Sequence, residues 1–219
     1  MHSFIQFITG PMVWISFGIC FIGIVFRLLQ IFRLTREKEN FMFTFLSVKF
    51  SLRSILVWLV PFLPVSTRKS PVFYAVSYIF HILLFLTPLF LLSHVILIEE
   101  NFNLSWWTVS DWLADIFTVA VICALIFFAI RRRMVPEVKF LTGLSDYVFI
   151  ILVALPFISG FIAYHQFFAY QWMVIIHVIS GELMLILIPF TRFFHMILAP
   201  LTRAYTASEF GGVRHSKDW

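Results

Sequence analysis

Five long apolar runs restrict this chain to a membrane fold more strongly than any other feature of the sequence. The runs cover residues 8–26, 72–97, 109–130, 147–164 and 172–198. An α-helix needs about 20 apolar residues to cross the hydrocarbon layer of a bilayer. Because lipid cannot satisfy backbone polar groups, helices are the expected structure of such runs. The sequence therefore predicts an all-α integral membrane protein, with five transmembrane helices in a bundle and a single membrane domain over residues 1–219.

The composition agrees with this assignment and argues against other classes of protein. Hydrophobic residues make up 61% of the chain and charged residues 12%, which is outside the range of soluble domains. The net charge of +5 does not indicate nucleic-acid binding, because the basic residues occur in short clusters between apolar runs. The cysteines form no Cys-x-x-Cys motif, which argues against an iron–sulfur cluster or a covalently attached haem within this chain.

The distribution of lysine and arginine predicts the orientation of the helices. With five crossings, every Lys and Arg falls on one side, and the other side receives residues 1–7, 99–110 and 165–171. The positive-inside rule then places the N-terminus outside and the tail 202–219 in the cytoplasm. Residues 41–65 are apolar but contain basic residues and prolines, so we expect an amphipathic inner segment between the first two crossings.

Four histidines lie inside two of the apolar runs, where an ionisable side chain is costly and indicates a functional site. His81 and His94 are in the second run, and His177 and His195 are in the fifth. Because these two helices run in opposite directions, they present two imidazole pairs at matching depths. The outer pair is His94 with His177, and the inner pair is His81 with His195. Paired imidazoles in a helix bundle can hold a haem, so we predict two haem sites across the bilayer.

The pairing requires the two histidines of each helix to lie on one face, and their spacing agrees with this in the fifth run but not in the second. His177 and His195 are 18 residues apart, which is about five turns and places both rings on one face. His81 and His94 are 13 residues apart and fall on different faces of an ideal helix. Their pairing needs a distortion, for which Pro88 is the candidate, or a side chain that reaches around the helix.

Three residues near His177 and His195 suit a membrane cofactor site. Gly181 lies one turn after His177 on the same face, where the missing side chain lets a flat ligand approach the backbone. Arg192 precedes His195 by one turn and is either a partner of a haem propionate or an ordinary snorkelling cation. Glu182 is interpreted as a buried acid that hydrogen-bonds within the bundle or takes part in a proton relay.

The motifs around these histidines resemble those of the haem-b membrane subunit, or gamma chain, of respiratory nitrate reductase and its relatives. His177-Val-Ile-Ser-Gly181 followed by Ile188-Pro-Phe-Thr-Arg192-Phe-Phe-His195 is similar to that family's H-x-x-x-G and F-P-F-S-R-x-x-H, with the same spacing. Phe80-His81 resembles the family's first ligand in its second helix. Residues 131–136 and 142–146 are also similar.

The resemblance implies two haem b groups and a path for electrons. In the family the outer histidine pair binds the distal haem and the inner pair the proximal haem. These pairs correspond to His94 and His177, and to His81 and His195. The family takes electrons from menaquinol or another quinol near the outer haem and passes them to a cytoplasmic iron–sulfur subunit. The protein is thus expected to be an electron-transfer subunit with quinone-reactive chemistry.

Two departures from nitrate reductase make the quinone site and the partners less specific. The helix-two histidines are farther apart here, and the loop 99–110 lacks the lysine of that enzyme's quinone site. A quinone site is expected at Trp107, Asp111 and His165, although His165 also suits an interfacial position.

Similar subunits occur in respiratory complexes of sulfate-reducing bacteria. There they associate with periplasmic multihaem cytochrome c and a cytoplasmic heterodisulfide-reductase-like iron–sulfur protein. The resemblance therefore implies membrane lipid and such subunits as partners, in a bacterial or archaeal cytoplasmic membrane. A haem-free membrane anchor and a transporter that uses intramembrane histidines for metal or protons are the alternatives. A transporter is expected to have internal repeats or broken helices.

Overall fold

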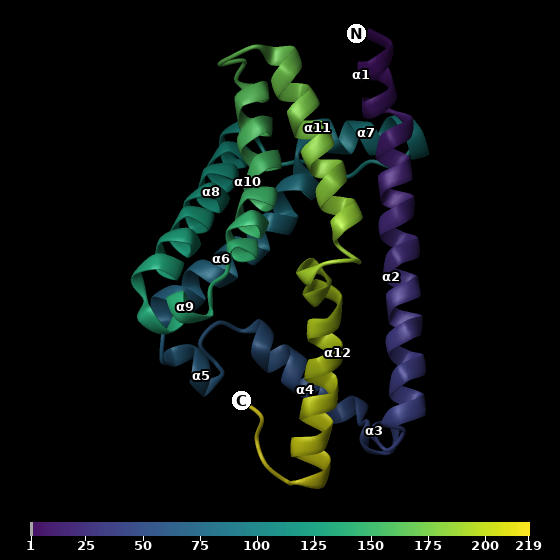
Figure 1. The fold of residues 1–219 in the computed structure, drawn as a ribbon, viewed down its shortest axis with the longest axis vertical. Helices are drawn as coiled ribbons and strands as arrows, with labels where there is room; N and C mark the ends of the chain where they lie inside the picture. The colour runs from purple at the N-terminus through teal and green to yellow at the C-terminus, as the bar shows by residue number, and fades with distance from the viewer. Residues whose placement is uncertain (1) are drawn as a thin grey trace. The chain divides into compact units, whose positions relative to one another are not determined.

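The structure is a computed structural model that describes residues 2–219, which are mostly α-helical and contain no β-strand (Figure 1). Among these residues, five helical segments are long and apolar enough to cross a membrane. They are Ser3–Lys38, Pro71–Phe90, Asp111–Met134, Leu144–Tyr164 and Tyr170–Leu187. The all-α fold with five membrane-competent helices is confirmed, and the protein is a multi-pass membrane protein.

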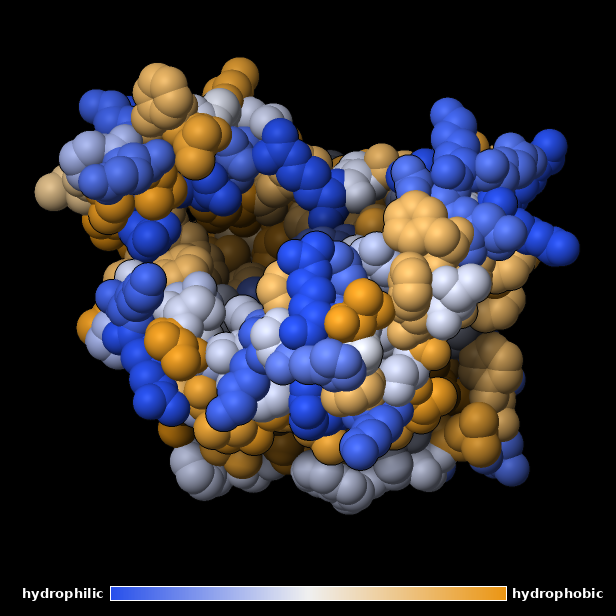
Figure 2. Space-filling model, turned by 90° about the horizontal axis from the view of Figure 1, so that it is seen from below, coloured by the Kyte–Doolittle hydropathy of each residue, from blue (hydrophilic) through white to orange (hydrophobic). Residues whose placement is uncertain are grey.

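Large apolar side chains remain on the surface, as expected of helices that contact lipid. On α2 (Pro11–Lys38), Phe21 and Ile22 are each 69% exposed. Apolar residues also reach the surface between the charged groups in Figure 2. Lipid tails can cover such side chains, because the bilayer core is as apolar as they are.

The chain forms two compact units, each with its own internal packing. The first unit joins the chain up to Tyr74 to Glu182–Trp219, and the second is Ala75–Gly181. A single membrane domain over residues 1–219 stays a prediction, because the internal contacts of the chain fall into two separate groups.

The second unit contains most of α6 (Pro71–Phe90), then α7 (Leu92–Phe102), α8 (Asp111–Met134), α9 (Pro136–Leu141), α10 (Leu144–Tyr164) and the first part of α11 (Tyr170–Leu187). Helices α8 and α10 pack together, with Val121 and Leu125 buried. The short helix α9 joins them, and Arg132 lies 3.5 Å from Asp146 across this turn. Asp146 also accepts a hydrogen bond from the Gly143 backbone N–H at 2.8 Å, so it caps α10.

The first unit contains α1 (His2–Thr9), α2, α3 (Met42–Phe45), α4 (Val48–Leu59), α5 (Val65–Arg68), η1 (Arg192–Phe194), α12 (His195–Ser208) and η2 (Glu209–Val213). Helices α4 and α12 lie side by side (Figure 1). The Ser47 backbone N–H donates to Ser208 Oγ at 3.0 Å, and Ser51 Oγ donates to the Ala204 carbonyl at 3.1 Å. The expected amphipathic segment 41–65 thus consists of α3 and α4 and extends to the start of α5.

Two predicted crossings are longer than the helices that the structure forms. The predicted crossing 72–97 is interrupted at Leu91, whose backbone is extended (φ −70°, ψ 132°) between α6 and α7. Pro88 stays inside α6, so the distortion lies three residues later than Pro88. His94 consequently lies on α7 rather than on the crossing helix.

The predicted crossing 172–198 is also wrong in its second half. Helix α11 ends at Leu187, turns follow, and α12 begins at His195. Pro189 has no backbone N–H to continue the helix, and Thr191 is extended and caps the next turn through its hydroxyl. His177 and His195 are therefore not on one continuous helix, and the argument from five regular turns does not hold.

Candidate functional site

The second unit brings the rings of His94 of α7 and His177 of α11 close together. Their ring centroids are 5.9 Å apart, and the ring planes are 12° from parallel. A bond from a metal to an imidazole nitrogen is about 2 Å long, so two imidazoles on opposite sides of one metal have centroids about 6 Å apart. The measured separation fits one metal atom between the rings.

The Nδ1 atom of each ring is held by a backbone carbonyl. His94 Nδ1 donates to the Pro88 carbonyl at 2.8 Å, and His177 Nδ1 donates to the Pro156 carbonyl at 2.8 Å. Because a carbonyl can only accept, the proton of the neutral imidazole lies on Nδ1, and Nε2 carries the lone pair. Within residues 2–219 no group hydrogen-bonds either Nε2. This is the arrangement that orients histidines for metal binding.

The break in the helix at Leu91 positions His94 and supplies its partner. In a continuous helix the Pro88 carbonyl would accept from the amide four residues later. The extended backbone of Leu91 ends that pattern, and the carbonyl accepts from the His94 ring instead. Nearby carbonyls at the end of α6 are also satisfied, since Trp106 Nε1 donates to Leu89 and the Val109 amide to Phe90.

Two residues of α10 that sequence reasoning missed make room for His177. A Cβ atom at Gly160 would lie 2.8 Å from both Nδ1 and Cε1 of the His177 ring, closer than real Cβ atoms approach. Pro156 lies one turn before Gly160 and provides the carbonyl for Nδ1. The sequence signal is a proline followed by a glycine at i+4 within an apolar helix, which gives His177 both a partner and space.

Gly181 lies one turn after His177 and has open space beside it. A Cβ atom placed there would meet nothing within 4 Å. This open space is what the approach of a flat ligand requires, so the position of Gly181 suits its predicted role.

The inner histidines have the same Nδ1 arrangement but different surroundings. His81 Nδ1 is 2.7 Å from the Ser77 carbonyl, and His195 Nδ1 is 2.7 Å from the Arg192 carbonyl. Both residues are exposed, and they belong to different units. Their pairing stays a prediction, as does the contact of Arg192 with a propionate.

The three predicted quinone residues lie in the second unit but have different partners. Asp115 lies 3.0 Å from His165 Nε2, and Asp111 precedes Asp115 by one turn of α8. Trp107 instead stacks on Phe90, with centroids 4.2 Å apart. His165 differs from His94 and His177 because a carboxylate occupies its Nε2.

These features define a class: a multi-pass helical membrane protein with a close pair of partly buried imidazoles. The chain is 34% identical to a protein of Nitratidesulfovibrio vulgaris over 208 residues, which cover 93% of this chain and 92% of that protein. The chain belongs to the same family as this protein, which carries a name that states no function. No known protein-family profile matches the chain, and no solved structure matches it.

Proposed function

We propose that the protein is a b-type cytochrome, the electron-carrying membrane subunit of a respiratory complex. The observation that supports this proposal most strongly is the pair formed by His94 and His177. The rings are 5.9 Å apart and nearly parallel, and each Nδ1 donates to a backbone carbonyl. The residues present therefore fit a haem that two histidines would hold.

The number of available ligands favours haem over a simple metal ion. Protein sites for transition metals such as zinc use three or four side chains. Residues 2–219 contain no group of three or more His, Cys, Asp and Glu residues that could hold a metal ion. A porphyrin provides the remaining ligands itself, so two histidines suffice.

Each residue of the site has a separate task in this proposal. His94 and His177 would hold the haem iron through Nε2. The carbonyls of Pro88 and Pro156 fix the ring orientations and increase the basicity of the ligands. Gly160 leaves room for the His177 ring, and Gly181 for the face of the porphyrin. When bound, the haem supplies reversible one-electron transfer.

The proposal also includes a second haem, the orientation in the membrane, a quinone site and partner proteins. A second haem b lies between His81 and His195, and Arg192 pairs with a propionate. The positive-inside rule supports an outside N-terminus and a cytoplasmic tail. Electrons pass between menaquinone near Trp107, Asp111 and His165 and an iron–sulfur partner at the basic inner face, in a bacterial or archaeal cytoplasmic membrane. A periplasmic multihaem cytochrome c is a further partner.

Haem b per polypeptide, measured as the pyridine haemochrome of the purified protein, tests the proposal. We expect two haems in the unmodified protein and one in His177→Ala or His94→Ala. His165→Ala is the matched control, because Asp115 already occupies its Nε2, and it should keep both haems. A protein without haem would support the membrane-anchor alternative. Equal haem content in His177→Ala and the unmodified protein would exclude His177 as a ligand.

A further inference from the structure

The three most exposed large apolar side chains of the described residues lie together at the turn between α8 and α10. Phe140 is 89% exposed, Leu144 81% and Leu141 79%, and Met134 at the end of α8 is 74% exposed. These four residues are called the α9 patch below. Single exposed apolar residues are ordinary, but a cluster of them indicates an interaction surface.

Hydrogen bonds hold this turn in one conformation, so the exposure of the α9 patch is not caused by a frayed loop. Thr142 Oγ1 donates to the Val138 carbonyl at 2.7 Å and accepts from Arg132 Nη1 at 3.3 Å. Arg132 also lies 3.5 Å from Asp146. The turn therefore uses its polar side chains for internal contacts and presents its apolar ones outward, which is the opposite of a turn built for water.

The position of the turn places the α9 patch at the edge of the bilayer. Only residues 135–143 separate α8 from α10, and both helices are long and apolar enough to cross a membrane. Figure 1 shows α9 at the ends of these two helices. Because α9 has 6 residues, it is only about 9 Å long. A segment this short, joined to a crossing helix at each end, stays near the level where the hydrocarbon layer meets the headgroups.

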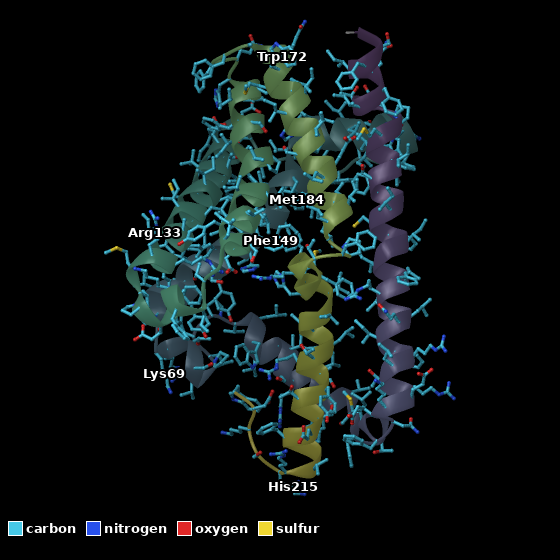
Figure 3. All side chains as sticks on the ribbon, viewed as in Figure 1. Lys69, Arg133, Phe149, Trp172, Met184 and His215 are labelled. Carbon is cyan, nitrogen blue, oxygen red and sulfur yellow. The ribbon has the colours of Figure 1, made fainter. Side chains whose placement is uncertain are left out.

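Basic side chains surround the α9 patch. Residues 131–146 contain four basic and two acidic residues, and one of the acids, Asp146, is already paired with Arg132. Arg133 and Lys139 are exposed, and Arg133, labelled in Figure 3, extends away from the end of α8. Long basic side chains can lay their stems along apolar surface and reach a headgroup with their charge. An excess of cations at the membrane surface attracts anionic lipid.

We propose that the α8–α10 turn is an interfacial anchor that binds an anionic phospholipid. Phe140 and Leu141 enter the outer part of the acyl layer, and Arg133 and Lys139 bind the headgroup phosphate through charge-assisted hydrogen bonds. An anionic lipid fits better than a protein partner, because its apolar tail and negative headgroup match the apolar patch and its cationic rim at bilayer level. The site needs no haem and is therefore independent of the cytochrome proposal.

Native mass spectrometry of the full chain, purified in dodecyl maltoside, tests this site by measuring the binding of added phosphatidylglycerol and phosphatidylcholine. We expect tighter binding of phosphatidylglycerol to the unmodified chain. The double variant Arg133→Gln, Lys139→Gln should bind phosphatidylglycerol roughly 25-fold more weakly, at about fivefold for each cation, and phosphatidylcholine as before. The double variant Phe140→Ser, Leu141→Ser should bind both lipids more weakly, because the acyl chains lose their contact.

The matched control removes two exposed cations from another helix end. Arg36 and Lys38 lie in the last turn of α2, where they alternate with Glu37 and Glu39. Arg36→Gln, Lys38→Gln should leave phosphatidylglycerol binding unchanged, because the acids there already balance the charge. Equal weakening in this control would mean attraction to net charge alone and would overturn the site at the turn.

Three further results would overturn the proposal. Equal binding of the two lipids to the unmodified chain would exclude an anionic-lipid site. Unchanged phosphatidylglycerol binding in Arg133→Gln, Lys139→Gln would exclude lipid at the turn and leave a protein partner to cover the α9 patch. Displacement of the lipid by inorganic phosphate would mean a simple anion site. If Phe140→Ser, Leu141→Ser does not fold, as judged by circular dichroism, the charge variant and its control still decide the outcome.

Discussion

The outer and inner histidines use the same hydrogen bond but acquire it in different ways. His81 and His195 bond carbonyls four and three residues earlier in their own chain segment, as any helical turn allows. His94 reaches back six residues across a helix break, and His177 bonds a carbonyl 21 residues away on another helix. The packing of the second unit therefore fixes the orientation of the His94 and His177 rings before any cofactor binds. The rings of His81 and His195 are oriented only by the helical turn on which each lies.

This comparison yields the largest expected effect in paired single variants. His81→Ala and His177→Ala should each lose one haem, half of the total. The haem left in His81→Ala should resist heating or detergent better than the haem left in His177→Ala, because a preorganised site loses less entropy on binding. Absorbance of the b-type band during a temperature ramp provides the measurement. A less resistant haem in His81→Ala would contradict the preorganisation of the outer site.

Gly160→Ala should weaken the outer site without removing a ligand. The new Cβ atom would lie 2.8 Å from the His177 ring and force it away from Pro156. Overpacking of this kind costs about 1–3 kcal/mol, which corresponds to haem binding that is weaker by roughly 5- to 150-fold. Haem titration of the apoprotein provides the measurement. Gly18→Ala is the control, because a Cβ atom there meets nothing within 4 Å.

Gly181→Ala separates haem binding from folding and should have a smaller effect. A Cβ atom at Gly181 meets nothing within 4 Å, so the apoprotein should be as stable as before or more stable by up to about 1 kcal/mol from helix propensity. Outer haem binding should decrease a few-fold, because the methyl group occupies the space left for the porphyrin. Unfolding of the apoprotein and haem titration provide the two measurements. Unchanged haem affinity would exclude a haem face at Gly181.

Arg132→Ala should have the smallest effect and leave both haem sites intact. The Arg132–Asp146 pair is partly exposed and spans 3.5 Å, so its loss should reduce stability by about 1 kcal/mol or less. Thermal unfolding measures this change, and the haemochrome should remain at the unmodified value. A loss of haem in Arg132→Ala would contradict this expectation, because none of the hydrogen bonds described for the four histidine rings involves the turn between α8 and α10.

The sequence by itself determined the all-α membrane fold and the presence of five membrane-competent helices. Length and hydropathy are local properties, and a bilayer acts on them directly. The sequence also selected His94 and His177, because an ionisable group in an apolar run stands out whatever its contacts are.

Only the tertiary structure decided where the helices break and what holds the rings. Hydropathy continues through Leu91 and Pro189, so the runs 72–97 and 172–198 gave no sign that the helices end at Phe90 and Leu187. The roles of Pro156 and Gly160 depend on a neighbouring helix, and residue spacing within one run carries no information about such a neighbour. Backbone direction and contacts between helices depend on the packing of the whole unit, so the phase of one ideal helix could not predict where the His94 ring lies.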